Sequence, residues 1–371
     1  MLLALALPAA QAAEGWQYGG DIRGGYFALD HTARDGGETD SDEFKFRLRL
    51  SADRQLTDTL SFRARLAGIY STEQDGSSVY LRGYPSRPGS GLAAGDATLD
   101  ELYVHYAPAD AGWTLRVGRM QTKFELPGVA SKGLDRNDSP NVDVTWTDGL
   151  HLTQSTWLDG WTTHFILQHN HHKGASVTAR SPLDFSDSGS RLSLFAGLEA
   201  TKDLGAVIQR VIGFTYMPDA LAPAGIVQAV REDYTALDAK LAAAWPVGNS
   251  GRKLVAGIEA AYAFNTPSGA TVGTGEAGDT DGLAWQIAAS IYDIRPGHHL
   301  GIVTGESGAG WLLSPDFRNN DRLHEIRYQW KFSSDWSMEA RYRIREERRI
   351  PADAEGARED RDIYIRLTGK F

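Results

Sequence analysis

Short segments with alternating apolar and polar residues recur along almost the whole chain. Segment 44–50 reads FKFRLRL, with apolar residues at the even positions and basic residues between them, and segment 60–66 repeats the pattern as LSFRARL. A period of two indicates a β-strand with one apolar and one polar face. We count sixteen such segments, at 16–29, 44–50, 60–66, 102–106, 113–117, 146–152, 161–168, 191–199, 207–216, 237–245, 254–264, 283–292, 299–303, 324–332, 336–345 and 361–371.

The connections between these segments alternate in length. Short turns lie at 55–59, 108–112, 158–160, 202–205, 246–252, 294–297 and 333–335, whereas long loops lie at 30–42, 71–97, 123–143, 170–189, 217–233, 265–281, 304–321 and 346–361. Short turns at one end and long loops at the other are typical of transmembrane β-barrels. The sequence therefore predicts an all-β, antiparallel transmembrane barrel of about sixteen strands. The alternation is ambiguous near Val207 and His299, which leaves the count open between fourteen and eighteen.

The first residues differ from the rest of the chain. Residues 1–13, MLLALALPAAQAA, form an apolar run that ends in small residues, as a secretory signal peptide does. We expect cleavage near Ala12 or Ala13 and a barrel over 14–371. No other stretch approaches the roughly 18 apolar residues of a membrane helix. The chain has no Cys, so disulfides are excluded.

Aromatic and charged residues assign the two faces of the predicted strands. Trp and Phe residues cluster beside the short turns, where a membrane interface is expected. Charge on a lipid-facing position costs about 2–4 kcal/mol at mid-membrane, so the charged face must point into the lumen. The predicted pore-lining bases are Arg23, Lys45, Arg47, Arg49, Arg63, Arg65, Arg116, Arg327, Lys331, Arg341, Arg343, Arg345, Arg366 and Lys370.

Few acidic residues share these inner positions. The strand pattern places only Asp21, Glu101, Glu325 and Glu339 beside the bases, which predicts a surplus of positive charge in the lumen. Water in a barrel of sixteen strands would solvate that surplus. The middle strands present milder polar positions, such as His164, Asp238 and Lys240.

Two motifs resemble those of Gram-negative outer-membrane proteins. The final segment, RDIYIRLTGKF, ends at Phe371 and resembles their C-terminal assembly signal. Over its mature length the chain resembles general bacterial porins, and GRMQTKFELPG at 118–128 is similar to the segment that opens their inward-folded loop. The pattern GRxxxxF…DG through Asp148 and Gly149 is also similar to phosphate-selective and alginate-export porins.

The resemblance to porins implies a constriction at 123–143. The acidic residues of this loop, Glu125, Asp135 and Asp138, would then face the basic wall of Arg47, Arg49, Arg63 and Arg65. It also implies outer-membrane lipid and lipopolysaccharide as surroundings, the barrel assembly machinery as a partner of the strand ending at Phe371, and a homotrimer.

These features together predict a passive diffusion channel that favours small anionic solutes. The alternatives are a specialised exporter or importer of an acidic polysaccharide or oligosaccharide, and a receptor or adhesin barrel. We expect no enzyme, no catalytic residue, no cofactor and no metal. The net charge of −10 argues against nucleic acid as a partner.

Three further patterns resemble chemical sites. Gly273, Gly275 and Gly278 match G-x-G-x-x-G, but no helix is expected after them to bind a phosphate. His324 and Glu325 begin a zinc-protease pair, but Tyr328 occupies the position of the second His. His169, His171 and His172 could bind a metal, although an exposed, solvated loop accounts for them more simply. Asp279 and Asp281, or the acids of loop 30–42, could bind Ca²⁺, but neither set has EF-hand spacing, and cations that bridge lipopolysaccharide are an equal alternative.

Overall fold

Seventeen β-strands form one sheet in this computed structural model. It describes residues 15–72, 98–135, 139–141, 144–170, 181–221, 231–248, 251–275, 278–314, 316–351 and 354–371. β6 (Ser139–Asn141) pairs only with β7, and the other sixteen strands form the barrel wall. The predicted count of sixteen is therefore confirmed.

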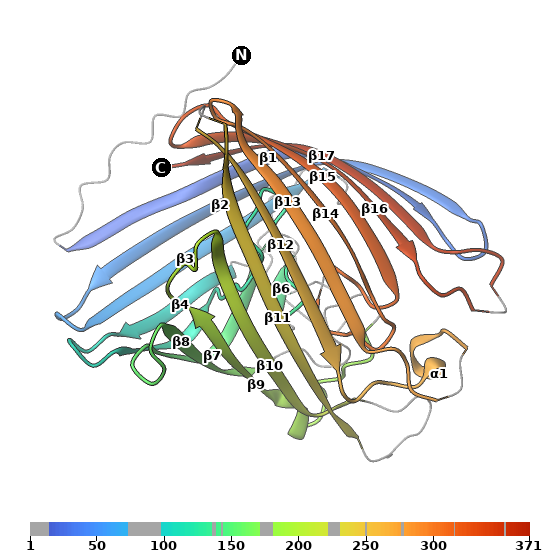
Figure 1. The fold of residues 1–371 in the computed structure, drawn as a ribbon, viewed down its shortest axis with the longest axis horizontal. Coiled ribbons are helices and arrows are strands. Elements are labelled where there is room, and N and C mark those ends of the chain that lie inside the picture. Colours follow the sequence, from blue (N-terminus) through green and yellow to red (C-terminus); the bar gives the residue numbers. More distant parts are fainter. Residues whose placement is uncertain are drawn as a thin grey trace.

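Each wall strand pairs antiparallel with its neighbours in the chain, and β5 pairs directly with β7 (Figure 1). The strands are β1 (Trp16–Thr32), β2 (Glu38–Gln55), β3 (Leu60–Ser71), β4 (Thr98–Tyr106), β5 (Trp113–Met120), β7 (Val144–Gln154), β8 (Trp161–His169), β9 (Leu192–Ala200), β10 (Val207–Leu221), β11 (Glu232–Val247), β12 (Arg252–Ala263), β13 (Leu283–Arg295), β14 (His298–Ser307), β15 (Asp321–Lys331), β16 (Trp336–Glu347) and β17 (Glu359–Lys370).

The first and last strands close the barrel. β1 pairs with β17 in continuous register from Asp21 opposite Lys370 to Thr32 opposite Glu359. Beyond this ladder, the Gly20 N–H donates to the Phe371 carbonyl at 2.9 Å, and the Phe371 N–H donates to the Gly20 carbonyl at 3.1 Å. Closure gives the edge groups of both terminal strands a partner, which an open sheet would lack.

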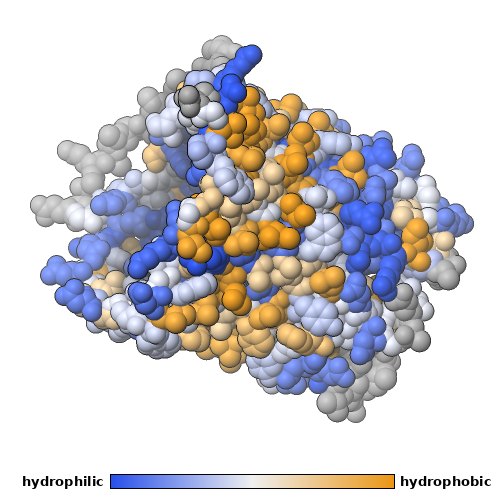
Figure 2. Space-filling model, in the orientation of Figure 1, coloured by the Kyte–Doolittle hydropathy of each residue, from blue (hydrophilic) through white to orange (hydrophobic). Residues whose placement is uncertain are grey.

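Alternating exposure separates an outer from an inner face. On β2, Phe44 and Phe46 are 60% and 42% exposed, whereas Arg47 between Phe46 and Leu48 is only 3% exposed. Figure 2 shows the exposed apolar residues as a band, with hydrophilic residues at either side. An apolar band around a closed barrel is the surface that a bilayer requires. The inner positions predicted for the middle strands, such as His164, Asp238 and Lys240, are buried.

Several strands continue beyond the segments expected from alternation. β1 and β2 join through a short hairpin in which the Ala33 N–H donates to the Gly37 carbonyl at 2.8 Å. The expectation of a long acidic loop at 30–42 is therefore wrong. Asp30 of β1 lies opposite Asp40 of β2 in the strand register. Beyond the apolar band both faces of a strand are polar, so the apolar alternation ends before the strand does.

Among the residues that the structure describes, helical structure is confined to short turns. α1 (Gly269–Val272) begins after Ser268 and ends at Gly273, whose φ of 72° is the left-handed conformation that favours glycine. The first Gly of the G-x-G-x-x-G pattern thus terminates a helix. η1 (Gly189–Arg191) is a single 3-10 turn before β9. Within the described residues, no helix is long and apolar enough to cross a membrane.

Candidate pore lining and inner segments

The basic residues of β2 and β3 point away from the exposed apolar face and pair with carboxylates. Arg47 and Arg49 lie 2.8 Å and 2.6 Å from the two oxygens of Asp21. Arg65 forms a two-pronged pair with Asp100, at 2.9 Å for each prong. A guanidinium and a carboxylate in this fork-to-fork geometry form a strong charge-assisted contact.

The basic residues of β15, β16 and β17 have the same kind of partner. Arg343 lies 2.6 Å from Asp362, and Arg366 lies 2.8 Å from Glu339. The remaining pairs among the predicted pore-lining bases join Lys45 to Glu43, Arg63 to Asp53 and Glu101, Arg327 to Glu325, Arg341 to Asp362, and Arg345 to Asp316.

At least ten of the fourteen predicted pore-lining bases therefore have a carboxylate partner, so pairing inside the barrel is more extensive than the sequence argument allowed. Asp53, Asp100, Asp316 and Asp362 are the partners that the sequence argument did not count. Asp53 and Asp100 belong to parts of β2 and β4 outside the predicted segments, and Asp316 belongs to a connection expected outside the barrel. Asp362 lies within the last predicted segment, on the face of the strand opposite to Ile363 and Ile365. Its inner location could therefore have been predicted from the sequence.

Segment 121–135 leaves the wall after β5 and lies against inner positions of distant strands. The Gln209 side chain of β10 donates to the Glu125 carbonyl at 3.0 Å. The Leu134 N–H donates to Glu259 of β12 at 3.0 Å, and the Val129 N–H donates to Ser290 of β13 at 2.9 Å. Because these partners lie on the buried face of the wall, the segment crosses the space that the barrel encloses.

A buried lysine joins this segment to β15 and to a second inner segment. Lys132, which is 2% exposed, has its Nζ 2.9 Å from Glu325 and 3.5 Å from Asp316. Burial opposes ionisation of Asp316, but Lys132, Arg343 and Arg345 outweigh it and hold the pKa of this carboxyl below its usual range. From the sequence, Lys132 was expected only to dilute the acidity of the constriction loop, and Asp316 was not singled out.

The three acidic residues expected in the constriction have different surroundings. Asp135 lies 3.4 Å from Lys240 of β11, whose Nζ also lies 2.7 Å from Asp238 and 2.9 Å from Glu259. The expectation that Asp135 faces the arginines of β2 and β3 is therefore wrong, because a fully buried Lys240 binds it on the far wall. Glu125 lies 3.5 Å from Lys123, and Asp138 lies outside the described residues.

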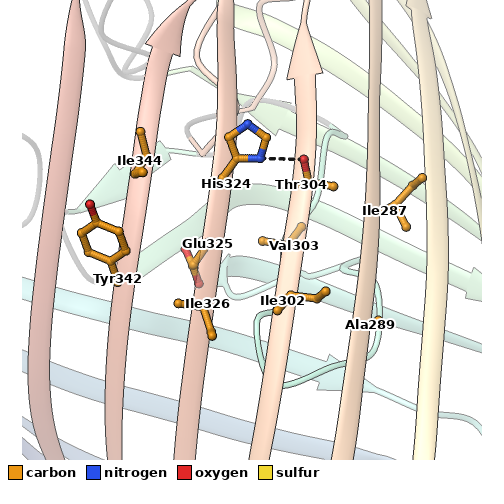
Figure 3. A pocket seen from close by; sticks show the side chains of 10 residues that line it. All are labelled: Ile287, Ala289, Ile302, Val303, Thr304, His324, Glu325, Ile326, Tyr342 and Ile344. Carbon is orange, nitrogen blue, oxygen red and sulfur yellow. Dashed lines mark hydrogen bonds between the residues drawn. The ribbon is translucent and has the colours of Figure 1, made fainter.

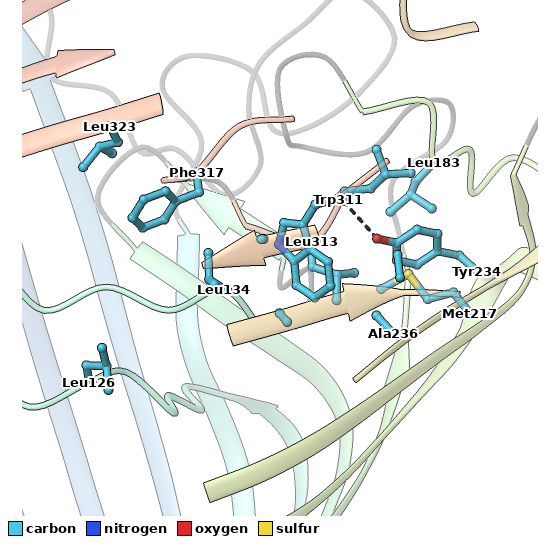
Figure 4. Packing of buried hydrophobic residues seen from close by; sticks show 14 of the residues in the cluster. Leu126, Leu134, Leu183, Met217, Tyr234, Ala236, Trp311, Leu313, Phe317 and Leu323 are labelled. Atoms are coloured by element: carbon cyan, nitrogen blue, oxygen red, sulfur yellow. Dashed lines mark hydrogen bonds between the residues drawn. The ribbon is translucent and has the colours of Figure 1, made fainter. Parts of the chain in front are cut away.

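Segment 308–320 also folds inward, although it was expected as an external loop. Trp311, Leu312 and Phe317 are completely buried. The Leu312 N–H donates to the Tyr234 hydroxyl at 3.0 Å, and this hydroxyl donates to the Gly310 carbonyl at 3.1 Å (Figure 4). The inner positions of β11, β12 and β13 that pack here are alanines, which leave room for the large side chains: Ala236, Ala242, Ala261, Ala263, Ala284 and Ala288.

These contacts define an inner apolar cluster. It joins Leu126 and Leu134 of segment 121–135 to Trp311 and Phe317 of segment 308–320, and it includes Leu183 before β9 (Figure 4). One half of the interior is thus packed with side chains, beside Lys240 and its three carboxylates, while the half lined by β1–β4 and β15–β17 carries the pairs of the predicted bases. This cluster had a signal in the sequence, namely the inward-facing alanines of β11–β13 together with the apolar Trp-Leu-Leu run in a loop.

The Gly-Arg and Asp-Gly parts of the GRxxxxF…DG pattern meet across β5 and β7. Arg119 donates to both oxygens of Asp148, at 2.7 Å and 2.9 Å, and lies over the Trp146 ring. Gly118 and Gly149 are paired one step further along the ladder, and a Cβ on Gly118 would lie 2.2 Å from the Leu102 carbonyl oxygen. In this chain the pattern therefore joins the two strands on either side of segment 121–135.

An apolar groove of about 330 Å³ lies on the outer face of β13–β16 (Figure 3). Ile287, Ile302 and Ile326 line it, and the His324 ring forms a 2.9 Å hydrogen bond with the Thr304 hydroxyl. His324 is exposed whereas Glu325 is buried, so the two residues point to opposite sides of the wall. They therefore cannot share a zinc site.

Metal ligands do not gather in the part of the chain that the structure describes. No group of three or more His, Cys, Asp or Glu side chains there has a metal-binding arrangement. Of the histidine cluster considered above, His169 is described and exposed, whereas His171 and His172 lie outside the described residues. Asp281 instead lies 3.3 Å from Arg348.

Comparison with solved structures identifies the fold. The chain is similar to OprB of Pseudomonas putida, with a TM-score of 0.59 and 11% identity over 96% of this chain and 94% of that chain. It is also similar to the anion-selective porin from Comamonas acidovorans, with a TM-score of 0.52 and 11% identity over 96% and 99% of the two chains. No family model and no curated protein sequence matches.

The fold is therefore that of Gram-negative outer-membrane porins. The closed sixteen-stranded barrel and its apolar band are the features that the chain shares with this fold.

Proposed function

We propose that this protein is a passive diffusion channel of the outer membrane that weakly favours small anionic solutes. The observation that supports this proposal is the division of the interior. Packed inner segments fill one half, and ionised side chains line the other. Arginine offers a planar fork suited to carboxylate and phosphate groups. Paired acids reduce the net field of these arginines, so the proposed preference is weak.

Segment 121–135 is the proposed constriction. It crosses the enclosed space and its hydrogen bonds to β10, β12 and β13 hold it there. The solute path would then run between this segment and the pairs around Arg47, Arg49 and Arg65. In this proposal no residue acts as a catalyst, and the strand that ends at Phe371 is the one that the barrel assembly machinery recognises.

The packed inner cluster is the observation that favours a second candidate. If this cluster closes the lumen, a receptor or adhesin barrel accounts for the fold better. An acidic polysaccharide channel shares the basic wall and differs from a small-anion porin in the solute that it admits.

Single-channel recording in a planar bilayer under a salt gradient tests the proposal. Purified, refolded protein is expected to give steady conductance with a small anion-selective reversal potential. A folded barrel without conductance would contradict the channel function and favour the receptor. A cation-selective reversal potential would contradict the proposed preference while leaving the channel intact.

A further inference from the structure

A row of nitrogen-bearing side chains crosses the inner face of four adjacent strands. Arg116 of β5 is opposite His105 of β4 and His151 of β7 in the strand register. The Arg116 Nη2 lies 2.6 Å from the His151 Nδ1, and the His151 Nε2 lies 3.1 Å from the His164 Nδ1 of β8. The row ends where the His164 Nε2 lies 3.2 Å from Glu199 of β9.

The direction of every hydrogen bond in this row follows from its two ends. A guanidinium can only donate, so the His151 Nδ1 must accept and its proton must be on Nε2. The His151 Nε2–H then donates to the His164 Nδ1, whose own Nε2–H donates to the acceptor-only carboxylate of Glu199. Both rings are therefore neutral while the row is intact.

Arg116 differs from the paired arginines of β2, β3, β15, β16 and β17 described above. Within the described residues, no carboxylate lies within ion-pair distance of its guanidinium, and its contacts are His151, the Gln121 carbonyl at 3.5 Å and the face of the Tyr103 ring. It is half-buried and keeps donors that these contacts do not use. A fixed positive charge with available donors is what an oxyanion binds.

We propose that Arg116 is an anion-binding position of the pore, which takes a carboxylate or phosphate group of a passing solute. The inference rests on the proposed channel function and names a residue at which its anion preference arises. Along the row, the neighbours of Arg116 are His105 on β4 and His151 on β7, and Glu199 is the acid at its end. Segment 121–135 contributes the uncharged Phe124, whose ring lies 5.0 Å from that of His164.

Block of single-channel current tests the binding position. The probes are sulfate, a tetrahedral dianion whose charge is constant from pH 5 to 8, and malonate at pH 7.5 as the dicarboxylate. For the wild type we expect concentration-dependent block by at least one of them. Arg116→Gln should raise the half-blocking concentration about fivefold, since a charge-assisted hydrogen bond is lost.

Two further variants separate a binding site from the overall charge of the lumen. Arg116→Lys keeps the charge but loses the fork, and we expect about a threefold rise in the half-blocking concentration. Arg322→Gln, an exposed arginine on the outer face beside Glu306, makes the same change in charge as Arg116→Gln and should leave block unchanged. If Arg116→Gln does not fold, Arg116→Lys carries the test.

Unchanged block in Arg116→Lys, or a conducting wild type that neither anion blocks, overturns the inference and leaves the channel function standing. A wild type without any conductance instead contradicts the proposed function.

Discussion

Lys132 shows how one residue can hold two inner segments in place. It lies between Glu325 of β15 and Asp316 of segment 308–320, with 2% of its surface exposed. Removing one member of a buried ion pair leaves an uncompensated charge, at a cost of about 3–5 kcal/mol. Because Glu325 retains Arg327, we expect Lys132→Met to lower the free energy of unfolding by about 2–3 kcal/mol.

Denaturant unfolding in detergent micelles measures this loss. Lys253→Met is the matched control, because Lys253 is exposed at the beginning of β12, and it should change the unfolding free energy by less than about 0.5 kcal/mol. Equal stability of the two variants would contradict the role assigned to Lys132.

Asp316 makes the attachment of segment 308–320 dependent on pH. Its pKa is depressed in the folded state, so its ion pairs contribute stability that is complete above about pH 4 and is lost as the pH falls through the folded-state value. We expect proteolysis within 308–320 to remain slow from pH 7 to pH 4 and to accelerate only in stronger acid. Pepsin, which is active in acid, is the suitable protease for the measurements below pH 4.

The neutral variant Asp316→Asn supplies the comparison. It removes the carboxylate that Lys132, Arg343 and Arg345 share, so the segment should be cleaved faster at every pH and without a transition in acid. A wild type that becomes sensitive well above pH 4 would show that another group controls the attachment.

At the scale of elements, alternation predicts strands better than it predicts the path of the connections. The charged and apolar faces of β2 could be predicted because Phe44, Phe46 and Leu48 must contact lipid. The inward path of segment 308–320 could not be predicted, because its burial depends on space left by alanines on β11, β12 and β13, which are distant in sequence. The extensions of β2 and β4 were missed because a strand outside the bilayer needs no apolar face.

The inner apolar cluster determines how much of the lumen is open. Trp311 is completely buried against it, and Trp→Ala in a packed core costs about 3–5 kcal/mol. We expect Trp311→Ala to release segment 308–320 from the wall and to raise single-channel conductance by about one half or more. Trp330→Ala removes an exposed aromatic ring from β15 and should leave conductance unchanged. Identical conductance in both variants would mean that the segment does not limit the current.

At the scale of the whole barrel, closure depends on a close contact between its two ends. A Cβ added to Gly20 would lie 2.4 Å from the Arg49 carbonyl oxygen and 2.6 Å from the Phe371 ring. We expect Gly20→Val to displace the final strand and to cost about 1–3 kcal/mol of stability. Thermal unfolding in detergent measures this cost, with Gly356→Ala, where the added Cβ meets open space, as the control. A Gly20→Val barrel as stable as the control would contradict a tight closure.

The pairing of charges across the whole lumen determines how selectivity depends on salt. Each arginine of the pairs around Asp21, Asp100 and Asp362 lies within a few ångströms of a carboxylate, so the fields of the two groups largely cancel at longer range. Unpaired bases would act over the Debye length, which falls from about 30 Å at 0.01 M salt to about 3 Å at 1 M. Added salt reduces the contribution of paired bases to selectivity less, because the net field of each pair is short-ranged at every salt concentration.

We therefore expect a chloride-to-potassium permeability ratio of about two to three at 0.1 M salt, falling towards one at 1 M as the remaining unpaired charge is screened. Reversal potentials at fixed concentration gradients and increasing mean salt measure this ratio. Asp21→Asn would remove the negative charge that Arg47 and Arg49 share, so it should raise the ratio at 0.1 M and steepen its decline with salt. If the wild type and Asp21→Asn share one salt profile, the pairs do not balance the lumen, and the positive charge inferred from the sequence alone is the better description.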